Sequence, residues 1–328
     1  MTNKNIFPVS KSTLSADALG KFIQKKYNLS NNVSCELIAR GINDIYIVKA
    51  NRKSYAARVL RSGARTKDQL SYEIELMLFY AKEGFHSPEP ICSNDNKYFI
   101  PILAPEGERY LTLFNWVEGV LLSDNASKKN IYNFGKHIAQ MHNINHKFKS
   151  RKKIHVDSSK YIKKYFPALV NLLNKKNDIL FYENLIQNAC TTFDQIKKDT
   201  IPYGPTHSDI HFRNVFLMEN NNFSLIDWDT CGNDFLIKEL TSFTWLINYL
   251  EKPKKLNEYF MNGYKEERKF TKEEEELYPL FFCMRHLHII CGVSKSVNII
   301  GHNIIGFNHS LENYKKLAVQ AGLDAGLL

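Results

Sequence analysis

The pattern of apolar residues changes in character near residue 115, and this change limits the possible folds. Before it, short runs of the strand type surround one helical pattern at Lys67–Glu83, and a further helical pattern opens the chain at residues 12–28. From Asn130 onward the pattern is helical, apart from one β-rich stretch at Tyr203–Asp229. The early strand-like runs are Val33–Ile38, Ile45–Ala50, Ser54–Leu60, Tyr98–Leu103 and Tyr110–Trp116. The sequence therefore predicts an α+β fold of two lobes, joined near Asn115–Gly119, with a ligand held in a cleft between them.

Composition places the chain among ordinary globular proteins. Of its 328 residues, 44% are apolar and 24% charged, which is far from the composition of disordered chains. No stretch approaches the roughly 18 uninterrupted apolar residues of a membrane helix, and the N-terminus lacks the apolar core of a signal peptide. The six cysteines show no paired spacing that would indicate a disulfide framework. The expected location is therefore the cytoplasm.

Two local features could indicate a binding site, but a purely structural interpretation is favoured for each. The segment Lys147–Lys164 holds eight basic residues and one acid, Asp157, so it could attract an anionic partner, although a solvated connection between helices is the favoured interpretation. The segment lacks the interleaved aromatics of a single-strand nucleic-acid surface. Cys283, His286, His288 and Cys291 resemble a zinc site, but on a helix they spread around more than half the circumference. A buried core helix is therefore favoured there.

The segment at residues 206–232, THSDIHFRNVFLMENNNFSLIDWDTCG, carries the chemistry. It contains His207-x-Asp209, then Asn214, a turn-rich stretch and an apolar strand that ends at Asp227. A loop aspartate can accept the proton of an attacking hydroxyl, while amide and carboxylate oxygens are the ligands that Mg²⁺ prefers. A hairpin between Asn214 and Asp227 would bring these two side chains together. The spacing therefore predicts phosphoryl transfer.

This pattern, HxDxxxxN followed by an apolar strand and DxD, resembles the aminoglycoside phosphotransferase and choline kinase-like superfamily. The resemblance covers most of residues 15–265 and is nearer to type II homoserine kinases and stress-response kinases than to the best-known antibiotic kinases. It implies a bilobal protein-kinase-like fold, with a small antiparallel sheet and one helix in the N-terminal lobe and a larger, mostly helical C-terminal lobe. It also implies Asp209 as catalytic base, His207 as support for its loop, and Asn214 and Asp227 as metal ligands.

The resemblance extends into the N-terminal lobe. RGINDIYIV at residues 40–48 resembles the family's first hairpin, where Gly41 and Asn43 would lie above the nucleotide phosphates. SYAARVLRSG at residues 54–63 resembles the strand that carries a phosphate-contacting lysine, and Arg58 occupies that position here. Arginine keeps the charge but is bulkier and bonds differently from lysine. The partner acid on the following helix is expected to be Glu73 rather than Glu75, since Glu73 borders the apolar stripe.

Five further residues take expected roles from the same resemblance. LTLFNWVEG at residues 111–119 resembles the segment whose backbone reads adenine, which assigns Asn115, Trp116 and Val117 to nucleotide binding. His142, in a helix that supports the catalytic loop, is expected to be structural. The family usually has an aspartate after DWDTCG, where this chain has Glu239, which we expect to brace the loop from a longer side chain.

The sequence thus predicts a nucleotide-binding lobe at residues 1–113, a hinge at 114–119 and a helical lobe at 120–328 with the catalytic loop and acceptor site. The expected reaction moves the γ-phosphate of ATP, with Mg²⁺, to a hydroxyl of a small molecule. Two alternatives stay open: a protein serine or threonine as acceptor, with the basic segment as docking surface, and an inactive nucleotide-binding regulator, suggested by Arg58. Nucleic acid and membrane partners are not expected. No motif names the acceptor, and aromatic residues such as Tyr161 and Tyr165 lie at helical spacing that favours a core role.

Overall fold

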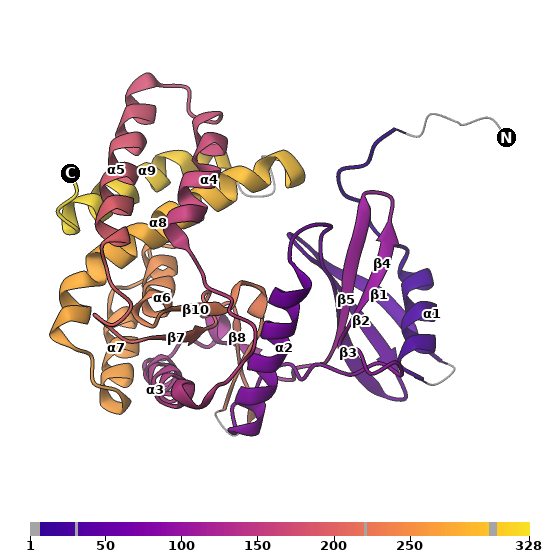
Figure 1. Ribbon diagram of the computed structural model, residues 1–328. Coiled ribbons are helices and arrows are strands. Elements are labelled where there is room, and N and C mark those ends of the chain that lie inside the picture. Colours follow the sequence, from indigo (N-terminus) through magenta and orange to yellow (C-terminus); the bar gives the residue numbers. More distant parts are fainter. Residues whose placement is uncertain (1–6, 30–31, 220–221, 302–306) are drawn as a thin grey trace. The chain divides into compact units, whose positions relative to one another are not determined.

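The computed structural model describes residues 7–29, 32–219, 222–301 and 307–328 (Figure 1). The chain divides into two compact units, which we describe separately. Unit 1 comprises Met1–Glu83 and Ser87–Glu118, and unit 2 comprises Gly84–His86 and Gly119–Leu328.

Unit 1 is built on one antiparallel sheet of five strands in the order β1-β2-β3-β5-β4. Its strands are β1 (Ser34–Arg40), β2 (Asp44–Ala50), β3 (Lys53–Val59), β4 (Phe99–Ala104) and β5 (Gly107–Asn115). The five predicted strands are confirmed, with ends that differ from the expected ones by a few residues. The sheet order follows from short connections, except that β5 pairs with β3 across an inserted helix.

Two helices lie on opposite sides of this sheet, α1 (Ala16–Lys26) and α2 (Lys67–Lys82) (Figure 1). The Ser15 hydroxyl caps α1 by accepting from the Ala18 N–H at 3.3 Å. The buried face of α1, with Leu19 and Ile23, packs against the sheet residues Tyr46 and Val48. Thr66 and Gln69 form a capping box at the start of α2, which fixes where this helix begins.

The β2–β3 hairpin turns through Asn51 and Arg52, whose φ angles are +52° and +62°. Two consecutive residues with positive φ make a tight turn whose twist matches that of the flanking strands. Ala50 and Lys53 pair directly across this turn. Lys53 therefore belongs to β3, one residue before the predicted strand-like run begins.

A buried cluster of charges joins the start of the described chain to the sheet. Arg109 Nη2 lies 2.6 Å from Asp44 Oδ2, both side chains are fully buried, and Lys11 Nζ lies 3.0 Å from Asp44 Oδ1. Arg109 also donates from Nε to the Leu60 carbonyl at 2.8 Å and from Nη1 to the Ser12 carbonyl at 3.0 Å. These paired charges hold the segment before α1 against the sheet.

Unit 2 is mostly helical. Its α-helices are α3 (Lys128–Ile144), α4 (Ser158–Val170), α5 (Lys176–Asp194), α6 (Ile237–Tyr249), α7 (Lys255–Glu267), α8 (Lys272–Ile300) and α9 (Phe307–Asp324). Its strands form a three-stranded sheet, β6-β8-β9, and a two-stranded sheet, β7-β10. Their bounds are β6 (Val120–Leu121), β7 (Tyr203–Thr206), β8 (Val215–Leu217), β9 (Phe223–Leu225) and β10 (Gly232–Phe235), with short 3₁₀ turns at Leu122–Asp124, Asn145–Lys147 and Trp228–Thr230. The predicted β-rich interruption is therefore confirmed.

The basic segment Lys147–Lys164 connects α3 to α4. Asp157 caps α4, accepting from the Lys160 N–H at 2.8 Å, and most of the basic side chains in the segment are exposed. The interpretation as a solvated connection agrees with this arrangement.

The long helix α8 runs through unit 2 and packs against α4, α6 and α9. Thr271 and Glu274 form a capping box at its start. Part of α8, Lys272–Val297, is the one described helix long and apolar enough to cross a membrane, and 56% of its most apolar window is buried within the structure. That burial is what a core helix of a globular unit shows.

The cysteine and histidine side chains of α8 are buried in the core or contact aromatic rings. Cys283, His286 and Cys291 are buried, and Trp245 Nε1 donates to His286 Nδ1 at 3.2 Å. The ring of His288 stacks on Tyr161, with centroids 4.0 Å apart. Within the described ranges, no group of three or more His, Cys, Asp or Glu side chains could hold a metal ion.

Candidate active site

The β8–β9 hairpin brings the two predicted metal ligands together. Val215 pairs with Leu225, and the Ile226 N–H donates to the Asn214 carbonyl at 2.9 Å, one step beyond the strands. Asp227 follows directly, so the backbone of Asp227 lies next to that of Asn214 although thirteen positions separate them in the chain. The hairpin expected from the sequence is therefore present.

Asp209 lies in the loop between β7 and β8, and three side chains surround its carboxylate. Asn214 Nδ2 donates to the Asp209 carbonyl at 3.1 Å and to Oδ2 at 3.3 Å. Arg285 of α8 pairs with Oδ1, and His211 Nε2 lies 3.6 Å from Oδ2. The carboxylate keeps 26% of its surface exposed, so it remains accessible to a ligand.

The charge beside Asp209 determines its protonation. Burial in the loop acts to raise the pKa of the Asp209 carboxyl. The positive charge of Arg285 outweighs that effect, with smaller contributions from His211 and His207, and lowers the pKa to about 2. The group is therefore an anion throughout the physiological range.

His207 joins the loop to the β9 end of the hairpin. Its Nε2 donates to the Ile226 carbonyl at 2.8 Å, which leaves Nδ1 to accept from the Asp209 N–H at 3.3 Å. The ring also lies 4.6 Å from the Trp228 ring. With both ring nitrogens engaged in this way, His207 has the geometry of a support for the Asp209 loop.

Two residues of the site have a left-handed backbone that is uncommon for side chains other than glycine. Ser208 has φ of +68° and Asp227 has φ of +65°. Such conformations cost on the order of 1–3 kcal/mol each and persist only where the surroundings enforce them. Ser208 directly precedes Asp209, the predicted base, and Asp227 is itself a predicted metal ligand.

Glu239 of α6 supplies part of that enforcement. Its Oε1 accepts from the Ser208 N–H at 2.8 Å, and its Oε2 lies 2.6 Å from His142 Nε2. His142 Nδ1 in turn lies 2.7 Å from the Tyr264 hydroxyl. Glu239 therefore braces the loop as expected, and His142 is structural as expected.

Removing this brace should impair turnover more than nucleotide binding. In Glu239→Ala the Ser208 N–H and the His142 ring lose their acceptor, so the loop can relax and displace Asp209. We expect kcat to fall about 100-fold, as catalytic groups misplaced by about 1 Å do, while the KM for ATP changes little. Steady-state phosphotransfer kinetics measure both. Glu239→Gln, which keeps an acceptor for Ser208, should recover part of the loss, and exposed Glu258→Ala is the matched control. An unchanged kcat in Glu239→Ala would contradict the bracing role.

In unit 1, Arg58 pairs with the predicted acid Glu73. Arg58 Nη1 lies 2.7 Å from Glu73 Oε1, and Arg65 Nη1 lies 2.5 Å from Oε2. Burial acts to raise the pKa of Glu73, but the two guanidinium groups outweigh it and lower the pKa below its usual value. Glu73 is fully buried and thus stays charged between two arginines. The choice of Glu73 over Glu75 as the partner acid is consistent with this pairing.

The remaining predicted nucleotide positions also lie in unit 1. Gly41 and Asn43 form the turn between β1 and β2, where the Gly41 N–H donates to the Asn43 carbonyl at 3.0 Å. The Asn115 N–H donates to the Glu89 carbonyl at 2.9 Å, and Trp116 N lies 3.4 Å from the Ser54 carbonyl. Val117 follows them just before the boundary of the unit.

Two arginines of these clusters are absent from the sequence prediction. Arg65 lies just before the cap of α2, and Arg285 lies 76 residues after the aspartate that it contacts. A basic residue before a helix cap, or inside an apolar helix, gives no local indication of its partner. The only available signal was that Arg285 interrupts an otherwise apolar run in α8.

Comparison with known proteins places this arrangement in a family. A model of the phosphotransferase enzyme family APH matches residues 34–278, which is most of the chain. The chain belongs to this family. The matched range contains both the Arg58–Glu73 pair of unit 1 and the Asp209 loop with its hairpin in unit 2. The predicted family and the predicted phosphotransferase class are thereby confirmed.

Relatives of the APH family chain span nearly its whole length. An uncharacterized protein from Synechocystis is 26% identical over 275 residues, covering 82% of this chain and 75% of the relative. The homoserine kinase of Rhodopseudomonas palustris is 21% identical over 323 residues, covering 95% and 94%.

Solved structures of other kinases share the fold. The amicoumacin kinase hAmiN in complex with AMP-PNP, Ca²⁺ and Ami superposes with a TM-score of 0.75 at 14% identity, covering 94% of each chain. The choline kinase LicA from Streptococcus pneumoniae superposes with a TM-score of 0.65 at 15% identity, covering 93% of this chain and 99% of that one. At these identities the likeness establishes the kinase-like fold that the sequence predicts.

Proposed function

We propose that this APH family enzyme transfers the γ-phosphate of ATP to a hydroxyl of a small molecule, with Asp209 as the base. The observation that supports this most directly is the Asp209 carboxylate, ionised and partly exposed. Asn214 fixes it on one side and Arg285 on the other, and the Asn214–Asp227 pair lies beside it. An acceptor hydroxyl that donates to Asp209 would be oriented for attack on a phosphoryl group.

The bond changes are those of an in-line displacement. The acceptor oxygen forms a bond to the γ-phosphorus while the bond from that phosphorus to the β,γ-bridging oxygen breaks, and the electron pair leaves with ADP. The proton of the acceptor hydroxyl passes to the Asp209 carboxylate. A pKa of about 2 makes Asp209 a weak base. In a loose transition state the proton moves late, so Asp209 serves mainly to orient the hydroxyl and to receive the proton once the new bond has formed.

Asn214 and Asp227 form a donor set suited to Mg²⁺. The Asn214 amide nitrogen is turned toward Asp209, so its Oδ1 is the atom that can bind a cation. The Asp227 carboxylate adds a second hard oxygen, held by the left-handed backbone at the end of β9. Bound there, Mg²⁺ neutralises charge on the nucleotide phosphates.

Arg58 is proposed to contact phosphate oxygens in place of the usual lysine, with Gly41 and Asn43 above the phosphates and Asn115, Trp116 and Val117 near the base. Glu73 holds Arg58 in place, and the Arg58 guanidinium lies 5.2 Å from the Phe114 ring centroid. Arginine can bind two phosphate oxygens through its planar fork.

Replacement of Arg58 tests this contact. Arg58→Met should raise the KM for ATP about 10- to 100-fold, the effect of removing one charge-assisted hydrogen bond of about 1.5–3 kcal/mol. Arg58→Lys should recover part of the binding. Nucleotide titration by calorimetry gives the affinity directly, and Lys82→Met, at the exposed end of α2, is the matched control. Equal affinity in Arg58→Met and the native protein would remove Arg58 from the nucleotide site.

The function as a whole is tested by incubating the protein with ATP and Mg²⁺ and following phosphate transfer. The acceptor panel includes aminoglycosides, other hydroxylated antibiotics, homoserine, choline, sugars, amino alcohols and a generic protein. Transfer to one small acceptor, abolished by a chelator and by Asp209→Ala, supports the proposal. Transfer to the protein alone would favour the protein-kinase alternative, and nucleotide binding without any transfer would favour the regulator alternative. The predicted cytoplasmic location and the absence of nucleic-acid partners stay predictions.

A further inference from the structure

One face of α8 continues away from Asp209 as a line of basic residues. Arg285, His288 and Lys295 are spaced by three and seven positions, so they share one side of the helix. α4 packs along this side, and the ring of Tyr161 lies flat on His288 with an interplanar angle of 8°. Gly292 makes this possible, because a Cβ atom there would lie 2.9 Å from the Tyr161 hydroxyl.

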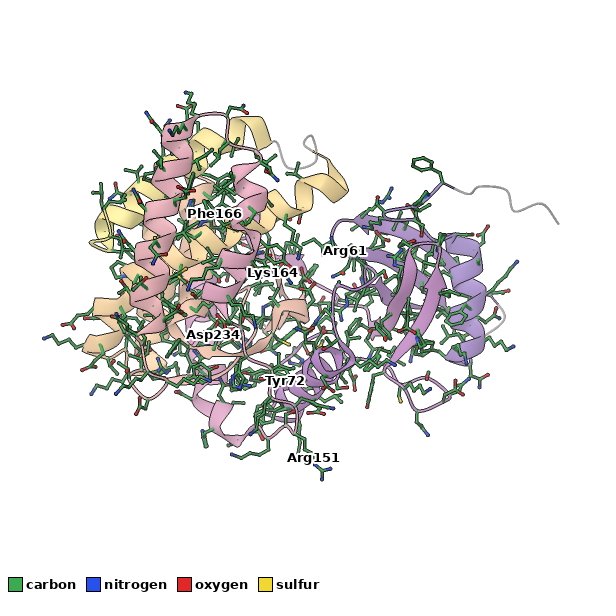
Figure 2. All side chains as sticks on the ribbon, turned by 45° about the horizontal axis from the view of Figure 1, so that its top comes forward. Arg61, Tyr72, Arg151, Lys164, Phe166 and Asp234 are labelled. Carbon is green, nitrogen blue, oxygen red and sulfur yellow. The ribbon has the colours of Figure 1, made fainter. Side chains whose placement is uncertain are left out.

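Lys295 is the last residue of this line, and its charge lies against aromatic rings. Its Nζ lies 3.9 Å from the Tyr165 ring centroid and 5.8 Å from that of Tyr161. No carboxylate of the described chain forms an ion pair with it. By contrast, Lys238 pairs at 2.5 Å with Asp234, a buried residue labelled in Figure 2. Lys295 is thus a half-buried cation that faces aromatic rings rather than an acid.

The neighbouring groups add to this positive field. Lys164, labelled in Figure 2, lies 5.2 Å from the Tyr165 ring. Burial acts to raise the pKa of Tyr165, but hydrogen bonding and charge from Lys295 and Lys164 outweigh it and lower the pKa. Burial lowers the pKa of His288 well below its usual value, with Lys238 and Arg285 adding to the effect, so His288 is neutral.

Polar atoms along the same face lack partners. Among the described residues, Arg285 Nε and His288 Nδ1 are buried and have no hydrogen-bond partner. Buried polar groups in native proteins are paired, so atoms of this kind indicate a water or ligand site. Arg285 also neutralises the charge of Asp209, which would otherwise repel an anion.

Resting on the proposed kinase function, we propose that the acceptor is an anionic hydroxy compound whose carboxylate or phosphate binds at Lys295 while its hydroxyl meets Asp209. Ten residues of helix span about 15 Å between Arg285 and Lys295, and the Lys295 side chain leans back toward Arg285. The anionic group therefore lies several bonds from the reacting hydroxyl. A cationic acceptor such as an amino alcohol or an aminoglycoside would be disfavoured along this face.

Matched compounds that differ only in charge test this proposal. We would compare gluconate, glucitol and glucamine, and in parallel pantothenate with pantothenol and glycerate with glycerol and aminopropanediol. Binding is measured by saturation-transfer NMR with Mg²⁺ and AMP-PNP, and transfer is measured separately with ATP. Anionic members should bind at least 10-fold more tightly than their partners in one or more of these sets, which corresponds to about 1.4 kcal/mol. Neutral or cationic members that bind as well as the anion in every set would overturn the proposal.

Variants of Lys295 assign the preference to this residue. Lys295→Met should remove the tighter binding of the anionic compounds, with a larger effect on KM than on kcat. Binding of the matched neutral compounds should not change. Lys295→Arg should retain the tighter binding of the anionic compounds, and exposed Lys316→Met on α9 is the control. Gly292→Ala, which displaces Tyr161, should weaken binding of the anionic compounds to a similar extent. An anion preference that survives Lys295→Met would contradict the proposed site.

The same experiments separate this inference from the proposed function. Asp209→Ala should abolish transfer yet keep, or strengthen, anion binding, because Arg285 then lacks its carboxylate. If transfer survives in Asp209→Ala, the catalytic assignment fails, while the comparison of native and Lys295→Met binding still decides the charge preference. Loss of anion binding in Asp209→Ala, in a variant that remains folded, would count against the anion site.

Discussion

Asp209→Ala is expected to lower kcat by about 10⁴-fold, the upper end of what a positioned general base contributes. The effect should be this large because Asp209 orients the hydroxyl, receives its proton, and also accepts from Asn214, the proposed metal ligand. Nucleotide affinity should stay within a few-fold of the native value, since none of the proposed nucleotide contacts in unit 1 involves Asp209. Single-turnover phosphotransfer, combined with nucleotide titration, separates the two quantities.

Two variants sharpen this experiment. Asp209→Asn keeps the shape and a partner for Asn214 but lacks the charge, so a comparable loss in both variants would assign the effect to the carboxylate. Exposed Asp199→Ala is the matched control for removing an aspartate from unit 2. If Asp209→Ala keeps more than about a tenth of the native turnover rate, the loss is too small for a general base, and the catalytic assignment of Asp209 is wrong.

Asp44→Ala is expected to destabilise unit 1 by about 3–5 kcal/mol, the cost of removing one partner of a buried ion pair. Both Asp44 and Arg109 are fully buried, so the substitution removes the nearest carboxylate of a buried guanidinium and leaves it only Glu106, at 3.6 Å. Urea denaturation, followed by hydrogen exchange in β3 and β5, measures this loss without interference from unit 2. The two units need not unfold together, so a single global transition should not be assumed.

A second substitution distinguishes charge from packing. Replacing both partners, as in Asp44→Ala with Arg109→Met, should recover part of the loss, because the buried guanidinium is then gone while Lys11 still lacks its carboxylate. Asp95→Ala, which breaks an exposed pair with Lys26, serves as control and should change stability little. A double variant as unstable as Asp44→Ala alone would indicate that shape, rather than charge, dominates.

Local signals in the sequence predicted most of the fold. The strands of unit 1 follow from short alternating runs, and α8 begins at Lys272 because the side chains of Thr271 and Glu274 each accept from the other residue's backbone N–H. The proposed catalytic segment stands out in the sequence because Asp209, Asn214 and Asp227 lie within twenty residues and the hairpin between them is itself a local structure. Glu239 was found through its place after the motif.

What the sequence did not predict depends on contacts between distant segments. Arg285 meets Asp209 only after α8 packs into unit 2, and Asp44 meets Arg109 only once β2 and β5 share a sheet. Neither helical nor strand periodicity carries information about such partners. The line of residues from Arg285 to Lys295 could not be predicted for the same reason, because Tyr161 and Tyr165, which contact it, come from α4, a distant segment of the chain.

The attachment of Lys11 and Ser12 to the Asp44–Arg109 cluster bears on how the protein is prepared. A shortened chain that starts after Ser12 would retain every strand and helix, since α1 begins at Ala16. It would nevertheless lose one cation beside Asp44 and one carbonyl that accepts from Arg109. The shortened chain is therefore expected to yield less folded protein than a chain that keeps Lys11 and Ser12.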